Sequence, residues 1–284
     1  MVTFFPIKIL TERREKMADI NNEKQHQRNL DVVKNLRLLD DDLMAAVFDN
    51  DKELTELVLN IIIGIPNLKV QKVVGQKTIK NLKGHSAILD IFAIDDKGIQ
   101  YDIEIQRADK GASEKRARYH SSLIDANSLS KGENFDKLPE TYVIFITEKD
   151  YFNKGLPIYH IDRIIRETNE TFKDKSHIIY VNGAHKNIDT DLGKLMHDFR
   201  MKEPAKMHYQ QLAEKTSYFK ENEKGVKKMC RAVEEYGNKR CEEGRTEGTK
   251  ETLLDLYKEG SITLEKLMEK LNISKSEAEK LVVN

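Results

Sequence analysis

The stretch that decides the fold spans residues 86–106 and reads SAILDIFAIDDKGIQYDIEIQ. Two runs rich in β-branched and apolar residues, 86–94 and 100–106, flank the turn-like segment Asp95-Asp96-Lys97-Gly98. Alternating apolar runs predict strands, and Asp and Gly between two such runs predict a tight turn. The sequence therefore predicts a two-stranded hairpin here.

Acidic side chains interrupt the apolar pattern of both strands. Because side chains alternate between the faces of a strand, Asp102, Glu104 and Gln106 share one face of the second strand. Pairing of the two strands can bring Asp90 and Glu104 to one point. A carboxylate within an apolar strand is costly unless it is paired, solvated or bound to a metal. Two hard oxygen ligands at one point suit Mg²⁺ or Mn²⁺.

Outward from this hairpin, the patterns predict a mixed α/β core followed by helices. Helical apolar spacing and β-branched runs distinguish the two kinds of element. The predicted helices cover residues 41–63, 112–129 and most of the chain after 191, and the further predicted strands cover 70–79, 141–147 and 178–181. Near-continuous apolar runs such as 141–147 are typical of buried central strands.

Composition limits the classes of function. The chain has 284 residues with 48 Lys+Arg and 48 Asp+Glu, so its net charge is zero. This length permits one large domain or one domain with appendages. Zero net charge excludes the whole-chain basic signature of a constitutive nucleic-acid binder, so any such function must rest on local patches or on metal ions. The only cysteines, Cys230 and Cys241, lack disulfide or zinc spacing and indicate a reducing, cytoplasmic location.

The sequence predicts neither a membrane span nor a signal peptide. The longest apolar run, residues 57–65, falls short of the roughly 18–20 residues that cross a bilayer. Residues 1–10 lack a basic start and a small-residue cleavage site. Because a more hydrophilic segment, typical of a protein start, begins at Met17, we hypothesise that residues 1–16 are an upstream extension of the reading frame. Finding Val2 on native protein by N-terminal sequencing would contradict this.

Four segments in order carry a family resemblance: 88–91 (ILDI), 98–106 (GIQYDIEIQ), 115–121 (KRARYHS) and 129–135 (LSKGENF). Together they resemble the bacterial family of recombination-promoting nucleases and transposase-like proteins, within the PD-(D/E)XK superfamily. The likeness continues through residues 143–147 and Tyr159. It implies a restriction-endonuclease-like mixed β-sheet core flanked by helices, with a helical C-terminal extension.

The resemblance also implies roles for individual residues. Asp90 matches the aspartate of the family motif, Glu104 its glutamate, and Gln106 the position where the superfamily usually has lysine. In such enzymes the acids bind Mg²⁺, which Mn²⁺ can replace, and the ion activates a water that attacks a DNA phosphodiester. Gln106 can orient that water but adds no charge. Glutamine is usual here within the family, so this departure does not by itself indicate a dead enzyme.

Further site residues are expected on helices. Superfamily sites often include an acid from the first helix, and Glu53 and Glu56 are both candidates for an additional metal ligand. Lys115, Arg116 and Arg118 are candidate contacts to DNA phosphates, although an ordinary charged helix flank explains them equally well.

We expect supporting roles for one further acid and for three histidines. We expect Asp102 to have a rim or turn-stabilising role, although it shares a face with Glu104. The histidines at 85, 120 and 160 show no spacing typical of zinc and are interpreted as structural or surface residues.

The expected organisation has four parts: a mobile N-terminal arm over residues 1–38, a PD-(D/E)XK nuclease-like domain over 39–200, a charged helical region over 201–250 and a small helical hairpin over 251–284. The charged region suits a solvated helix or a contact in a homo-oligomer. The hairpin resembles a helix-turn-helix, but packing against the main domain or a second subunit explains it equally well.

Three functions follow from this sequence. The first is a Mg²⁺-dependent DNA endonuclease linked to recombination or mobile elements. The second is a non-catalytic DNA-binding or protein-interaction member that keeps the nuclease fold, because the motif lacks its lysine. The third is a nuclease held inactive by self-association through the charged helices.

Overall fold

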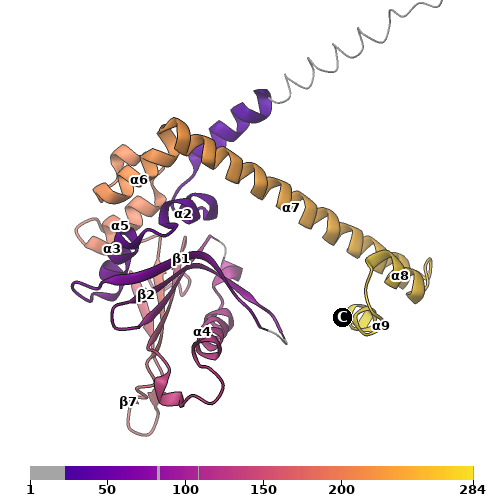
Figure 1. Cartoon of the computed structure of the whole chain (residues 1–284), viewed down its shortest axis with the longest axis horizontal. Coiled ribbons are helices and arrows are strands. Elements are labelled where there is room, and N and C mark those ends of the chain that lie inside the picture. Colours follow the sequence, from indigo (N-terminus) through magenta and orange to yellow (C-terminus); the bar gives the residue numbers. More distant parts are fainter. Residues whose placement is uncertain (1–22, 82–83, 108, 284) are drawn as a thin grey trace, which may run out of the picture. The chain divides into compact units, whose positions relative to one another are not determined.

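The computed structural model describes residues 23–81, 84–107 and 109–283, and it divides into two compact units after Cys230 (Figure 1). Residues 1–22, which include most of the predicted arm and the whole hypothetical extension, lie outside the described residues. The rest of the predicted arm is different from our expectation, because residues 23–35 form a helix. Asn29 and Val33 are buried on it, so a few inward positions order a segment whose composition is polar.

A six-stranded mixed sheet forms the core of the first unit, with the strand order β1-β2-β3-β4-β8-β5. Its strands are β1 (Val70–Ile79), β2 (Ala87–Asp95), β3 (Gln100–Gln106), β4 (Thr141–Thr147), β5 (Ile158–Ile161) and β8 (Ser176–Asn182). β1, β2 and β3 are antiparallel neighbours, β3, β4 and β8 are parallel, and β5 runs antiparallel to β8. A separate small hairpin consists of β6 (Ile164–Ile165) and β7 (Glu170–Thr171).

The predicted hairpin is confirmed as β2 and β3. Its turn is stabilised by Asp95, whose Oδ1 accepts hydrogen bonds from the backbone N–H groups of Lys97 (2.9 Å) and Ile99 (2.8 Å). Gly98 has a φ of 81°, a left-handed conformation that glycine adopts without a steric penalty. The turn therefore fixes the register in which Phe92 faces Asp102.

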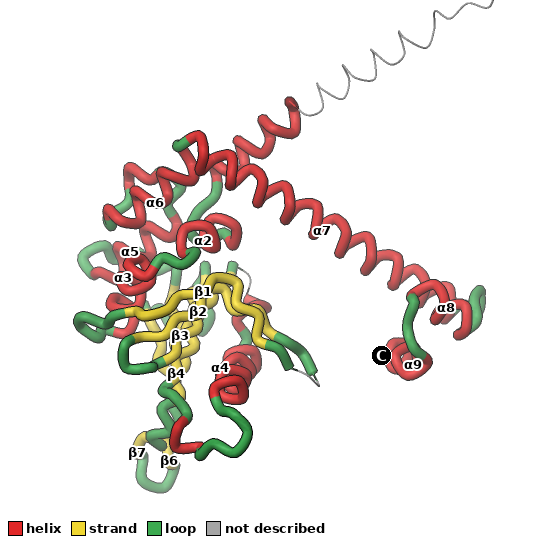
Figure 2. Tube along the Cα trace, viewed as in Figure 1, coloured by secondary structure: helices red, strands yellow, loops and turns green. Residues whose placement is uncertain are grey.

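Helices cover both faces of the sheet. Their bounds are α2 (Asp41–Phe48), α3 (Lys52–Ile63), α4 (Glu114–Ser128), α5 (Asp191–Arg200), α6 (Gln210–Glu221) and α7 (Glu223–Lys258), with short 3-10 turns η1 (Asp109–Ala112), η2 (Phe135–Lys137) and η3 (Pro204–Lys206). Figures 1 and 2 show α4 on one side of the sheet and α2, α3 and α5 on the other. The predicted helical stretch 41–63 is two helices, because the side chain of Asp51 caps a new helix by accepting from Leu54 N.

The core under α4 is mainly apolar, but it includes two buried acids, Asp102 and Glu104. Phe145 of β4 stacks on Tyr180 of β8, with ring centroids 5.4 Å apart, and both are buried. β3 lies beside β4 in parallel register and places Asp102 beside Val143 and Glu104 beside Phe145. Both carboxylates therefore point into the layer between the sheet and α4, where they are fully buried.

The second unit comprises the rest of α7 from Arg231, together with α8 (Leu264–Leu271) and α9 (Lys275–Val283). Thr263 caps α8, and the predicted cap of α9 is confirmed because Ser274 and Glu277 exchange side-chain and backbone hydrogen bonds. Within the described residues, no helix is both long and apolar enough to span a membrane.

Candidate active site

The two predicted acids meet where the pairing of β2 and β3 changes. The backbone register runs as far as Ile91 opposite Ile103. One residue further, side chains bond to the backbone of the opposite strand: Asp90 N donates to Glu104 Oε1 (3.0 Å), and Ile105 N donates to Asp90 Oδ2 (3.1 Å). The chain thus holds both carboxylates at one point by reciprocal hydrogen bonds.

β1 supplies a third contact to this point. Gln76 of β1, which lies between Gly75 and Lys77 where these pair with Ile91 and Leu89, donates from Nε2 to Asp90 Oδ1 at 3.3 Å. Its φ of 50° is unfavourable for a residue with a side chain, a strain of the kind often found at functional sites. The neighbouring Lys77 places its Nζ 3.1 Å from the ring centroid of Phe92, and its positive charge acts to lower the pKa of Asp102.

Among the described residues, Arg116 is the guanidinium that contacts the acids directly. Ser113 begins α4 by accepting from Arg116 N, which places Arg116 in the first turn of the helix. Its Nη2 donates to Glu104 Oε2 (2.8 Å), its Nη1 to the carbonyl of Gly111 (3.0 Å) and its Nε to His120 Nε2 (3.3 Å). Of the three candidate DNA contacts, Arg116 is therefore turned inward, whereas Lys115 and Arg118 are exposed.

Asp102 and His120 form a buried pair beside Glu104. Asp102 Oδ2 lies 2.9 Å from His120 Nδ1. Because His120 Nε2 accepts from Arg116, we assign the ring proton to Nδ1, which donates to Asp102. Asp102 Oδ1 is buried without a hydrogen-bond partner among the described residues. The expected rim role of Asp102 is wrong, because its side chain is fully buried against His120. Burial of His120 excludes the surface role expected for it and agrees with the structural one.

Burial and mutual repulsion change the acidity of these groups. Burial raises the pKa of Glu104 well above its usual range, and the negative charges of Asp102 and Asp90 raise it further. Burial raises the pKa of Asp102 to about 8. Burial and the charge of Asp41 raise the pKa of Asp90. Crowded acids with raised pKa values indicate a site in which negative charge exceeds the positive charge of the neighbouring Arg116 and Lys77.

The donor set fits a divalent cation. Ligand atoms of Asp102, Glu104 and His120 lie within 4.8 Å of one another, and Asp90 bonds to the backbone of the same hairpin. Carboxylate oxygens are the ligands that Mg²⁺ and Mn²⁺ prefer, and the unpartnered Asp102 Oδ1 is an acceptor that a cation or its water can satisfy.

The structure brings neither predicted helix acid to Asp90 among the residues it describes. Glu56 Oε1 accepts from Val70 N (2.9 Å) and its Oε2 from Lys69 Nζ (2.9 Å), which ties α3 to the start of β1. Glu53 instead lines a separate hollow beside Lys215 of α6.

In the part of the chain that the structure describes, Asp41, the first residue of α2, is a helix acid whose charge acts on the site. Its negative charge raises the pKa of Asp90, and the positive charge of Arg116 acts to lower the pKa of Asp41. Sequence reasoning missed Asp41 because it belongs to the acidic run 40–42 and looks like ordinary N-terminal helix charge.

Gln106 lies at the edge of the cluster. Its Nε2 is 3.5 Å from Glu104 Oε2, and its Oε1 lies over Gly111. A Cβ at position 111 would be only 1.9 Å from that oxygen, so any larger residue there must displace the Gln106 amide.

This contact gives a prediction for Gly111. Gly111→Ala is expected to lower the DNA cleavage that the sequence predicts by about tenfold or more, because Gln106 is misplaced, whereas the melting temperature changes little because a flexible side chain can move away. A double-mutant cycle checks the cause: in a Gln106→Ala background, Gly111→Ala should have no further effect on cleavage. An undiminished effect there would show that Gly111 acts through another contact.

A second cluster of possible metal ligands has a structural explanation. Asp198 lies beside His197 and His208, but Asp198 Oδ1 accepts from His208 N (2.8 Å) and Asp198 Oδ2 from Tyr209 N (2.8 Å). Backbone donors thus satisfy this buried carboxylate, in contrast to Asp102. We interpret Asp198 as an anchor for the segment that leads into α6.

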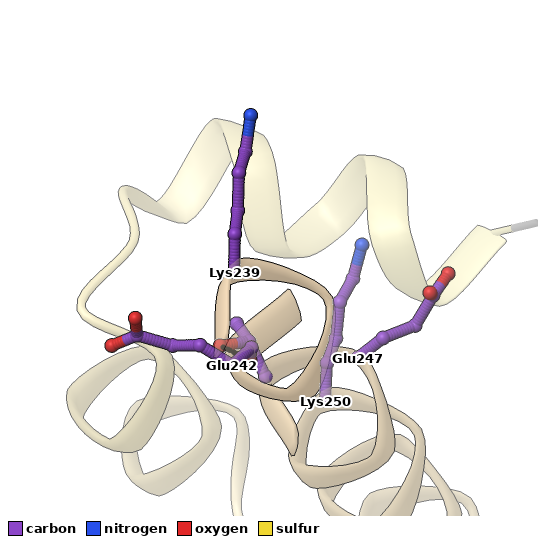
Figure 3. A pocket seen from close by; sticks show the side chains of 5 residues that line it. Lys239, Glu242, Glu247 and Lys250 are labelled. Atoms are coloured by element: carbon purple, nitrogen blue, oxygen red, sulfur yellow. Dashed lines mark hydrogen bonds between the residues drawn. The ribbon is translucent and has the colours of Figure 1, made fainter. Parts of the chain in front are cut away.

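The second unit has a hollow along α7 that is lined by charged side chains of both signs (Figure 3). Figure 3 shows Glu242 and Glu247 pointing away from each other, with Lys239 and Lys250 nearby. Because these acids do not converge, the hollow lacks the ligand arrangement that a metal ion requires.

A mixed sheet flanked by helices, with paired acids on adjacent antiparallel strands, is the restriction-endonuclease-like α/β fold that the sequence predicts. A family model described as PD-(D/E)XK nuclease family transposase matches residues 46–261, and the chain belongs to this family. The match includes Asp90, Glu104 and Gln106 but begins after Asp41 and ends before α8. No curated protein and no solved structure matches the chain.

Proposed function

We propose that this chain is a Mg²⁺-dependent DNA endonuclease that hydrolyses phosphodiester bonds in the cytoplasm, in connection with DNA recombination or mobile elements. One observation carries the proposal: Asp90 and Glu104 are held together by reciprocal backbone hydrogen bonds in a family of nucleases. Strand transfer would need a further site that holds donor ends and target together, so the proposal is confined to hydrolysis.

The residues divide the chemistry among them. Asp90 and Glu104 hold the metal ion, and the negative charge of Asp41 on α2, which acts on Asp90, adds to their attraction for it. When bound, Mg²⁺ or Mn²⁺ activates a water and stabilises charge on the phosphate. Gln106, which carries both a donor and an acceptor, orients the attacking water. Lys115 and Arg118, exposed near each other on α4, contact the DNA backbone.

The assignment of Asp41 is tested against the two acids predicted from sequence. Asp41→Asn is expected to weaken Mn²⁺ binding about tenfold and to slow DNA cleavage, because it removes a negative charge that acts on Asp90. Glu53→Gln is the matched control and should leave both quantities nearly unchanged, since Glu53 lines another hollow. The reverse pattern would place Glu53 in the metal centre.

A non-catalytic role is the second candidate. It is favoured by the hydrogen bonds to all four oxygens of Asp90 and Glu104 and by the absence of lysine at position 106. Metal-independent DNA binding that is unaffected by Asp90→Ala, without any cleavage, would establish this alternative. Metal-dependent cleavage of supercoiled plasmid that EDTA abolishes would exclude it.

We also propose that the chain self-associates through its C-terminal helices. Residues 237–242 and 244–249 of α7 are exposed, and a Cβ at Gly237, Gly244 or Gly248 would meet open space. An exposed polar helix with three glycines gains little stability from its own sequence. Packing against the same helix of a second copy could supply the missing stability. Light scattering over a range of concentrations, combined with cleavage assays, shows whether a dimer forms and whether it is inactive.

A further inference from the structure

Arg116 is the countercharge that several acids share. Its guanidinium bonds to Glu104, to the Gly111 carbonyl and to His120. Its charge also acts to lower the pKa values of Asp41, Asp90 and Asp102. In this structure Arg116 therefore supplies the positive charge that a divalent ion would bring to the same acids.

The geometry leaves little room for both cations at Glu104. The carboxylate is fully buried, its Oε1 accepts from Asp90 N, and its Oε2 accepts from Arg116 at 2.8 Å. An ion bound between Asp90 and Glu104 would lie within a few ångströms of the guanidinium, where like charges repel strongly in a buried setting. Repulsion from a bound ion thus favours a position of Arg116 away from Glu104 Oε2.

We propose that Arg116 and the divalent ion compete for Glu104, and that loading of the ion turns the Arg116 guanidinium from the acids toward a DNA phosphate. This inference rests on the proposed function. Arg116 is then a DNA-binding residue only after the metal has bound, so metal and DNA bind cooperatively.

Features around Arg116 suit such an exchange. Its side chain is 36% exposed, whereas Glu104 is 0% exposed, so the guanidinium can reach the surface and the carboxylate cannot. The neighbouring Lys115 and Arg118 are exposed on the same helix and can hold the DNA backbone nearby. A released guanidinium also matches a phosphate well, because its planar donors bind two oxygens at once.

The first test measures metal binding without DNA. Mn²⁺ titrations followed by electron paramagnetic resonance should give a dissociation constant about tenfold lower for Arg116→Met than for the wild type, because a charge-assisted competitor is removed. Lys115→Met is the matched control: it removes the same charge one residue away, from an exposed position, and should change the constant less than about twofold.

Thermal unfolding gives an independent readout. In EDTA, Arg116→Met should melt below the wild type because its acids lack a countercharge, and Mn²⁺ should raise its melting temperature more than it raises that of the wild type. If Arg116→Met does not fold in EDTA, Arg116→Lys replaces it. Lysine keeps the charge but cannot make all three hydrogen bonds, so its Mn²⁺ affinity should fall between the other two.

The second test measures coupling to DNA. Fluorescence anisotropy of a labelled duplex oligonucleotide, in EDTA and in Ca²⁺ as an oxygen-binding probe ion, should show the ion strengthening wild-type binding about tenfold. In Arg116→Met, the ion should no longer strengthen DNA binding. Lys115→Met should bind DNA more weakly in both conditions, but the ion should still strengthen its binding to the same degree.

The outcomes separate this inference from the proposed function. If Mn²⁺ binding persists in Asp90→Asn/Glu104→Gln, or is absent from the wild type and Arg116→Met alike, the metal centre itself is wrong. If Mn²⁺ binds through those acids but Arg116→Met leaves the dissociation constant unchanged, the exchange is wrong and the endonuclease proposal stands.

Discussion

Asp90→Asn is expected to lower the rate of DNA cleavage by at least about a hundredfold while leaving the protein as stable as before or more stable. Loss of one metal ligand removes several kcal/mol of transition-state stabilisation. The folded state, in contrast, keeps an oxygen that accepts from Ile105 N, and Gln76 can turn its amide to bond the new side chain. Removal of a negative charge near Asp41 also relieves repulsion.

The measurement is nicking of supercoiled plasmid in Mg²⁺, Mn²⁺ and EDTA, together with urea unfolding of each variant. Glu104→Gln should lower cleavage in the same way but should be less stable than the wild type, because its amide has one oxygen where Glu104 uses two, one for Asp90 N and one for Arg116 Nη2. Asp96→Asn is the matched control, because it removes an exposed carboxylate from the turn of the same hairpin. If Asp90→Asn and wild type nick plasmid equally above the EDTA background, Asp90 is not a metal ligand.

The second large effect is on the pH dependence of stability and involves Asp102. Burial raises the pKa of this carboxyl group from 3.8 to about 8. Between these values the folded chain holds a proton that the unfolded chain releases, so the free energy of unfolding decreases as the pH rises. In EDTA, the wild type should lose about 1 kcal/mol per pH unit more than Asp102→Asn over this window.

Urea unfolding at pH 5, 6, 7, 8 and 9 measures this difference. The curves of free energy against pH should converge in slope above about pH 8, where Asp102 is ionised in both states. Asp42→Asn provides a control, because the pKa of Asp42 is raised only to about 6. Its effect on stability should therefore be confined to a narrower pH range, below about pH 6. Parallel slopes for the wild type and Asp102→Asn between pH 5 and 8 would show that Asp102 is ionised despite its burial.

The central strands of the sheet could be predicted because each has a strong local pattern of apolar residues. Alternation in 86–106, with its turn residues, defined the hairpin, and the apolar run 141–147 identified β4 as buried. Strand order could not be read in this way, since it depends on contacts between distant segments. The helix over residues 23–35 was missed for a related reason: its inward positions, such as Val33, are too sparse to produce a periodic signal.

The acids of the site were partly accessible from sequence. Asp90 and Glu104 are close along the chain and a hairpin joins them, so their meeting could be predicted. Asp41 and His120 come from helices on opposite sides of the sheet, and their placement depends on tertiary packing. The spacing of Arg116 and His120, four residues apart on one helix, was a usable signal, because such residues face the same side.

Gln76 has a consequence beyond the metal centre. β1 is an edge strand of ten residues, and a long, regular edge is a template on which other chains can add strands and aggregate. The left-handed backbone at Gln76 interrupts that edge near its middle. We therefore expect the residue that donates to Asp90 also to limit sheet extension at this edge, so variants at position 76 should be examined for solubility as well as for cleavage.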